Sequence, residues 1–242
     1  MNKRRFYHAV LVLGTVCLLI VGGCGQWRRS ERRQESLNRQ LIAALVKHDN
    51  QQALVFINAG ADPNTPLIPL PAPSLRQFWN YLIHRSPLPV NHSPTAFLIA
   101  CGAWWQQSNN NTRSTTIDGG NQFPLIQSML QHGANIEAKG LLEWTPLMWA
   151  AYHGDPKLVS VLLAQGANSN ARSYTGETAL YWAVEEAVSR NGSDAKNVIS
   201  QLCAHGADPN LHAPEGETPL QWAQKNHCSD LVALLKQAGA KK

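Results

Sequence analysis

The sequence predicts an all-α solenoid of about five helix-turn-helix units with long inserts, because two phrases recur along the chain. The first phrase is Gly-Ala followed by a polar residue, and from Gly133 onward its copies lie 33, 40 and 33 residues apart. The gap from Gly60 to Gly133 is 73 residues, the length of one short and one long unit. A fixed period near 33 is typical of a solenoid in which each unit is one supersecondary element.

The second phrase begins with Thr and keeps register with the first. It starts at Thr95, Thr145, Thr178 and Thr218, which precede the glycines of their units by 38, 21, 28 and 21 residues. A Thr side chain caps the free N–H groups at a helix start, and Pro is favoured in the first helical position. We therefore expect the first helix of each unit to begin after this Thr.

The second helix of each unit is predicted by an apolar rhythm that ends at the repeat glycine. Two stretches show it most clearly: Leu158, Val159, Leu162 and Leu163, and Leu231, Val232, Leu234 and Leu235. Their spacing is that of a helix with one buried face. The glycine that follows suits the left-handed conformation that ends a helix. A degenerate opening unit is expected at residues 41–44.

Together the two phrases resemble the ankyrin repeat family, whose pattern is T-P-L-H-x-A, a second helix and then G-A-D-x-N. The resemblance covers about residues 41–242. It implies antiparallel helix pairs joined by hairpin fingers, with partners held at the finger tips and at the ends of the first helices. Met148, Tyr181 and Gln221 stand where the family has His. This puts in question the hydrogen bonding that the family His usually supplies.

The chain divides into a leader at residues 1–23, a tether at 24–40 and the repeat domain at 41–242. The repeat domain carries inserts at about 65–92, 104–121 and 188–194. The first insert is rich in Pro and replaces a finger, so we expect it on the finger side. The other two lie between helices and should emerge at the opposite end.

The leader resembles a bacterial lipoprotein signal peptide. A basic start (Lys3 to Arg5) precedes an apolar core from Ala9 to Val21, and two glycines then lead into Cys24. The resemblance implies that Cys24 carries a lipid and becomes the mature N-terminus. The alternative is an uncleaved anchor over about residues 6–23, near the lower length limit for a membrane span. Both interpretations place the repeats on the periplasmic face of a bacterial membrane.

The net charge gives no indication of nucleic-acid binding. The formal charge is +5, but Lys3, Arg4 and Arg5 belong to the leader, and the rest of the chain carries 18 basic and 16 acidic residues. The tether is rich in Arg, and it either rests on anionic headgroups or forms a solvated linker. We therefore expect a membrane contact through the anchor and no nucleic-acid partner.

The sequence lacks the common motifs of catalytic, phosphate-binding and metal-binding sites. It contains no G-x-S-x-G elbow, no H-E-x-x-H, no phosphate-binding P-loop and no paired C-x-x-C. We predict no enzyme activity, no cofactor and no metal. Outside the leader and Cys24, three cysteines remain, and a bridge between Cys203 and Cys228 stays open. Cys101 occupies a column of small residues and is expected to be a buried hydrophobe.

The candidate binding surface is the row of finger tips. Large apolar residues at a tip that should face solvent indicate an interaction site, and aromatic residues are favoured anchors. Acidic residues around them would suit a partner with a basic rim. The partner-binding candidates are Leu141, Leu142, Glu143, Trp144, Tyr152, Tyr174, Glu177, Glu215 and Glu217. The alternative is that Leu141 and Trp144 fold under the Pro-rich insert as local core.

Three other tryptophans are predicted to form a core column. Trp149, Trp182 and Trp222 occupy the same position of the first helix in successive units. Stacked units therefore place them in one inward line, so they are expected to contribute to folding rather than to binding.

A solitary ankyrin lipoprotein of the cell envelope is similar to the immunity proteins of type VI secretion phospholipase effectors. That similarity implies a protein that binds a phospholipase toxin and covers its catalytic cleft, with the anchor concentrating it at the bilayer. The alternatives are an envelope adaptor or stress-protection protein without a toxin partner, and a hydrolase whose site lies in the inserts.

Overall fold

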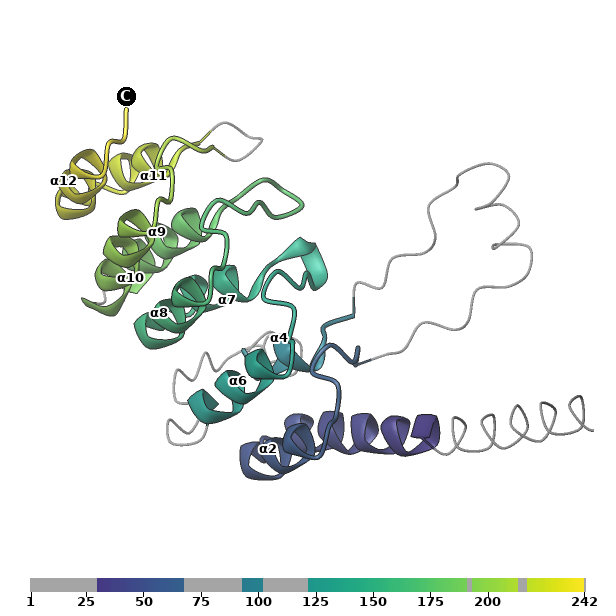
Figure 1. The fold of residues 1–242 in the computed structure, drawn as a ribbon. Coiled ribbons are helices and arrows are strands. Elements are labelled where there is room, and N and C mark those ends of the chain that lie inside the picture. Colours follow the sequence, from purple (N-terminus) through teal and green to yellow (C-terminus); the bar gives the residue numbers. More distant parts are fainter. Residues whose placement is uncertain (1–29, 68–92, 102–121, 191–192, 213–216, 242) are drawn as a thin grey trace, which may run out of the picture.

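The computed structural model describes residues 30–67, 93–101, 122–190, 193–212 and 217–241. Five helix pairs stack side by side through these residues, and Figure 1 shows them in sequence order. In the described residues the regular structure is helical, apart from one isolated bridge between Pro66 and Thr95. The predicted all-α solenoid of about five units is therefore confirmed.

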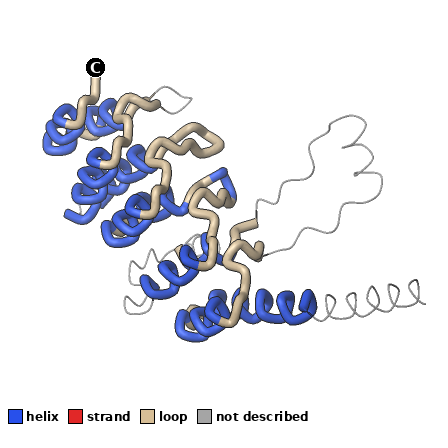
Figure 2. Tube along the Cα trace, in the orientation of Figure 1, coloured by secondary structure: helices blue, strands red, loops and turns tan. Residues whose placement is uncertain are grey.

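Each unit pairs a first helix with a second helix that runs back beside it (Figure 1). The opening unit pairs the helical residues 30–46 with α2 (Asn50–Asn58). The other first helices are α4 (Ala96–Ala100), α7 (Pro146–Tyr152), α9 (Ala179–Arg190) and α11 (Pro219–Lys225). The other second helices are α6 (Gln122–Gln131), α8 (Pro156–Ala164), α10 (Ser193–Ala204) and α12 (Ser229–Gln237). The loops between units project from one side of the stack as fingers (Figure 2).

The helix ends follow the residues that predicted them. Thr145 accepts a hydrogen bond from the Met148 N–H, and Thr95 and Thr218 cap α4 and α11 in the same way. Gln221, at one of the positions where the family has His, completes a capping box by accepting the Thr218 N–H at 2.8 Å. After α8 the chain turns at Gly166 with φ of 86°, a left-handed conformation that costs glycine little.

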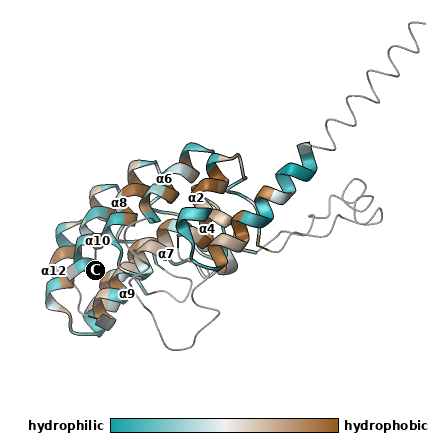
Figure 3. Cartoon of the chain, turned by 90° about the horizontal axis from the view of Figure 1, so that it is seen from below, coloured by the Kyte–Doolittle hydropathy of each residue, from teal (hydrophilic) through white to brown (hydrophobic). Residues whose placement is uncertain are grey.

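The core is a continuous apolar layer between stacked helix pairs. It runs from Leu41 in the opening helix to Leu235 in α12 and includes Phe97, Met129 and Leu180. Hydrophobic and hydrophilic stripes alternate along the helices in Figure 3. Since each unit buries its apolar face only against its neighbours, the fold is a stack that depends on contact between successive units.

Asparagine side chains tie neighbouring fingers together at three places. Asn170 donates through Nδ2 to the Gly206 carbonyl at 2.9 Å, and its Oδ1 accepts the Asp208 N–H at 2.8 Å. Asn64 makes the same two bonds to Gly133 and Asn135, and Asn210 makes them to Gly239 and Lys241. One amide group therefore satisfies two backbone groups of the following unit, a carbonyl and an N–H.

The opening helix begins earlier than the sequence suggests. Residues 30–46 are one helix, whereas the sequence interpretation assigned 24–40 to a tether and started the repeats at 41. Gln34 Nε2 donates to the Gly60 carbonyl at 2.7 Å, and Asn38 Oδ1 accepts the Asp62 N–H at 2.9 Å. These two side chains serve the same pair of finger groups that a preceding Asn serves elsewhere. Residues 34–40 thus act as the N-terminal cap of the array.

The expected inserts lie mostly outside the described residues, including 68–92 and 102–121. The two ends of the first insert meet, because the Leu67 N–H donates to the Pro94 carbonyl at 2.9 Å and the Ala96 N–H donates to Thr65 at 2.8 Å. The extra residues near 188–194 lengthen α9 and α10 to 12 residues each, compared with 7 and 9 in α7 and α8.

Candidate functional site

The finger of the third unit, residues 140–144, has an unusual backbone. Its tip is a short 3₁₀ turn, Leu141–Glu143, in which Leu142 has φ of 61° and Glu143 has φ of 57°. In the next unit the position of Glu143 is occupied by Gly176, with φ of 83°. Two consecutive side-chain-bearing residues are therefore held in the left-handed region, where residues other than glycine are strained.

Two large side chains stand exposed on neighbouring fingers. Leu142 is 58% exposed and Tyr174 is 75% exposed. Their fingers are joined directly, since the Tyr174 N–H donates to the Leu142 carbonyl at 2.8 Å. We call Leu142 and Tyr174 the finger-tip patch. Both were candidates from the sequence, and the structure places them on adjacent tips.

Trp144 and Tyr152 are not on the exposed surface, which corrects the expectation for these two candidates. Trp144 is only 5% exposed and Tyr152 only 7%. The Trp144 ring lies 4.6 Å from the Trp149 ring and 4.4 Å from the Trp182 ring, centroid to centroid. The tight turn at the tip brings the Trp144 ring back onto α7 and α9. Burial there removes the large apolar surface of the ring from water.

The tryptophan column is thus wider than the sequence indicated. Trp149 is buried, and Trp182 and Trp222 are half-buried. Tyr181 connects the last two, with its ring 5.6 Å from Trp182 and 6.2 Å from Trp222. The aromatic residues of three successive units therefore form one connected cluster, which we call the aromatic cluster: Trp144, Trp149, Tyr152, Tyr181, Trp182 and Trp222.

The acidic residues near the tips are largely matched by neighbours within the chain. Glu143 pairs with Lys139 at 2.9 Å, and Glu217 pairs with Lys225 at 2.8 Å. Glu177 accepts hydrogen bonds from the hydroxyls of Ser173 and Thr175. The acidic surface expected from the sequence is therefore weaker than a count of carboxylates suggests. Three candidates are not described: Glu215, Cys24 and the side chain of Leu141.

Comparison with known proteins identifies the architecture. A family model of ankyrin repeats, in three copies, matches residues 116–212. The crystal structure of an ankyrin repeat domain from Acinetobacter baumannii AYE aligns with a TM-score of 0.62 at 25% identity, covering 83% of this chain and 81% of that chain. The fold is that of an ankyrin-repeat array.

Two curated relatives match the chain over stretches of 94 and 59 residues. The mitochondrial disaggregase of Bos taurus is 31% identical over 94 residues, which are 38% of this chain and 13% of that protein. The ankyrin repeat and SAM domain-containing protein 6 of Rattus norvegicus is 39% identical over 59 residues, which are 24% of this chain and 7% of that protein. The chain therefore matches only a small part of the length of these relatives.

The ankyrin array also contains three cysteines, whose thiols are potentially reactive. Cys101, Cys203 and Cys228 are free thiols, so the bridge left open between the last two is not formed here. Burial, reinforced by the charge of Asp155, raises the pKa of the Cys101 thiol far above its ordinary value. Within the described residues, no cluster of His, Cys, Asp or Glu is placed to hold a metal ion. Nor does any helix in that part of the ankyrin array have the length and hydropathy of a membrane span.

Proposed function

We propose that the protein is a protein-binding module and that the finger-tip patch is the centre of its binding surface. The observation that carries this proposal is Leu142, which is 58% exposed while its backbone is in a left-handed conformation. In the next unit Gly176 stands at the position of Glu143, and Thr175, at the position of Leu142, is outside the left-handed region, so the strain at Leu142 and Glu143 is not required by the fold. A side chain kept at that cost, and exposed, is best explained by contact with a partner.

Tyr174 extends the surface from one unit to the next. Its exposed ring lies on the finger bonded to Leu142. Exposed Tyr and Leu side chains on adjacent rigid tips supply the apolar anchors that protein interfaces favour. Known ankyrin-repeat proteins are mostly interaction modules without enzyme activity, which supports binding over catalysis.

The test separates binding from stability. Leu142→Gly removes the side chain and relieves the left-handed strain, so the free energy of unfolding should stay the same or rise. Binding to a partner recovered by cross-linking from envelope extracts should weaken at least tenfold. Val55→Ser is the matched control, because Val55 is 63% exposed on α2, away from the fingers. Equal binding by wild type and Leu142→Gly would exclude the patch as the anchor.

The location we propose is the periplasmic face of a bacterial membrane, with the chain held there by a lipid on Cys24. The support is the leader sequence: a basic start, an apolar core and small residues immediately before the cysteine. Cys24→Ser should block processing and leave a longer precursor. Fatty-acid labelling that is unchanged in Cys24→Ser would exclude the lipid anchor.

The partner class we propose is a phospholipase effector with a basic rim, which the protein would neutralise as an immunity protein. The support is the proposed envelope location together with Glu177, whose carboxylate lies at a finger tip and accepts hydrogen bonds from two hydroxyl groups. Cells that export such a lipase to the periplasm should survive with the wild-type protein and lyse with Leu142→Gly. Lysis with both would favour the alternative, an envelope adaptor or stress-protection protein.

A further inference from the structure

One position of the amide series between units departs from the others. Asn64, Asn170 and Asn210 each lie four residues after a repeat glycine, and Glu137 occupies that position in the second unit. Its Oε1 accepts the Asn168 N–H at 2.7 Å. An ionised carboxylate has no N–H to donate, so Glu137 cannot bond the Gly166 carbonyl as an amide would. The second and third units are therefore tied by half of the usual pair of hydrogen bonds.

Helix packing is also weakest at this junction. Between the first and second units α2 packs along α6, and between the third and fourth units α7 packs on α9 and α8 on α10. Between the fourth and fifth units α9 packs on α11. Among the described helices, no such close pair spans the junction of the second and third units. The missing hydrogen bond thus coincides with loose packing.

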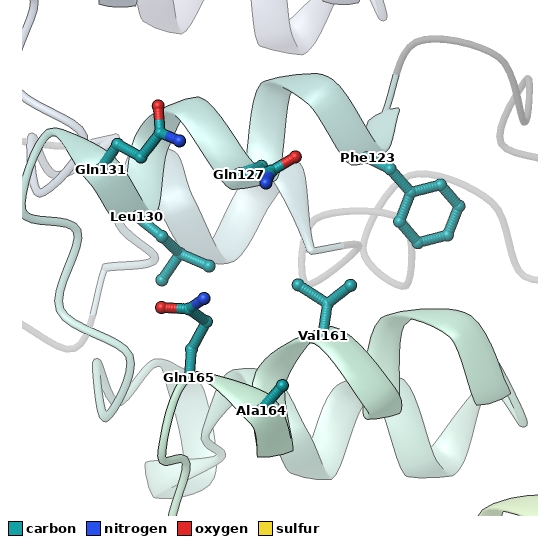
Figure 4. Close-up of a pocket in the computed structure, with 7 residues that line it drawn as sticks. All are labelled: Phe123, Gln127, Leu130, Gln131, Val161, Ala164 and Gln165. Atoms are coloured by element: carbon teal, nitrogen blue, oxygen red, sulfur yellow. The ribbon is translucent and has the colours of Figure 1, made fainter.

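A groove of about 250 Å³ lies between the second helices at the same junction. Leu130 of α6 and Gln165 of α8 point toward each other across it, and Val161 lies in its middle (Figure 4). The units remain in contact on the finger side, where Leu98 Cδ1 is 3.4 Å from the position that a Cβ on Gly140 would take. The second and third units therefore touch on the finger side, at Gly140 and Leu98, and are separated by the groove on the side of the second helices, α6 and α8.

We propose that this junction is a hinge built into the array, at which the first two units move as one body against the last three. The pivot is the contact of Gly140 with Leu98, and the groove between α6 and α8 widens or narrows as the angle changes. The finger with Leu142 crosses the hinge, so a partner that touches both bodies would select one angle. The hinge is a property of the array itself and stands whether or not the proposed partner is correct.

Glu137→Asn tests the hinge by supplying the missing donor. The probe is hydrogen exchange of the full chain in detergent, followed by mass spectrometry of its peptides. In wild type, the amides of α6 and α8 should exchange faster than those of α10, because opening of the hinge exposes the two helices that line the groove. Glu137→Asn should slow exchange in α6 and α8 by roughly three- to tenfold, the effect of one net hydrogen bond, and leave α10 unchanged.

Two matched variants separate the donor from the charge. Glu137→Gln keeps the length of the side chain and adds an N–H, so it should slow exchange in part, whereas Glu137→Ala, which has neither charge nor donor, should speed it. Asn170→Glu places a carboxylate at a well-packed junction and should loosen the last two units by a smaller factor. Equal protection of α6, α8 and α10 in wild type, or unchanged exchange in Glu137→Asn, would overturn the hinge.

Discussion

Trp144 shows how far the position of a single residue can alter its role. It lies at a finger by sequence, yet its ring is 95% buried among the rings of Trp149 and Trp182. Trp144→Ala should therefore lower the free energy of unfolding by about 3–5 kcal/mol, as expected for a buried large aromatic residue. Chemical denaturation of Trp144→Ala and Trp149→Ala, compared with wild type, measures both losses.

The control for this prediction is Trp144→Phe. The indole N–H of Trp144 is buried without an acceptor in the described structure, so phenylalanine keeps most of the apolar contact and removes an unsatisfied donor. Its loss of stability should be well below that of Trp144→Ala. A Trp144→Ala protein as stable as wild type would contradict the burial and restore Trp144 as an exposed anchor.

Cys101 leads to a prediction of pH dependence. Its pKa is raised by burial, so the folded chain keeps the thiol neutral while the unfolded chain ionises it near the ordinary pKa of about 8.5. Below that pH the Cys101 thiol is protonated in both states, and its contribution to the free energy of unfolding is fully present. Above it, the unfolded state loses the proton first, and stability falls by up to about 1.4 kcal/mol per pH unit.

Cys101→Ala removes this titration, and alanine suits a column of small residues. Unfolding curves from pH 8 to about 10.5 should fall less steeply for the variant than for wild type. Identical slopes for the two proteins would show that the thiol also ionises in the folded state.

At the scale of the element, the helix at 30–46 is the clearest departure from the sequence interpretation. The first half of this helix is rich in charged residues, and this composition suggested a linker. Its apolar contacts with the core begin only at Leu37. The informative pair was Gln34 and Asn38, four residues apart on one helix face. Their partners lie 26 and 24 residues away, and only the fold brings them together.

The helix leads to a prediction about truncation. A chain that begins at residue 41 should have a free energy of unfolding at least about 2 kcal/mol lower than a chain that begins at residue 30. The shorter chain lacks the two cap hydrogen bonds and the contact of Leu37. The double variant Gln34→Ala with Asn38→Ala should account for about half of the difference. Thermal unfolding of these chains tests the cap, and equal melting temperatures would return residues 30–40 to the role of a linker.

The helices themselves were predictable because local residues determine their ends. Thr145 and Thr218 start helices and Gly166 follows one, and these effects act within four residues of the position concerned. The site was less predictable. The turn that returns Trp144 to the stack depends on Trp182, a full unit later, so a repeat pattern read along the chain gives no sign of it.

At the scale of the whole molecule, the repeat period predicted the number and order of units but not the strength of the contacts between them. Each unit follows the same template, whereas cohesion depends on single positions such as Glu137 and Asn170. In a solenoid, stability is close to the sum of unit and interface contributions. One altered position can therefore divide the array without changing its appearance.

The three bridging asparagines have a consequence for the lifetime of the protein. Asn is a chemically labile residue whose amide hydrolyses slowly to a carboxylate. Asn64, Asn170 and Asn210 lie on the fingers, where water has access to them. Deamidation of any one would exchange a donor for an acceptor and reproduce the arrangement of Glu137 at a second junction. Chemical ageing should therefore loosen the array one unit boundary at a time, with each event visible as an added negative charge.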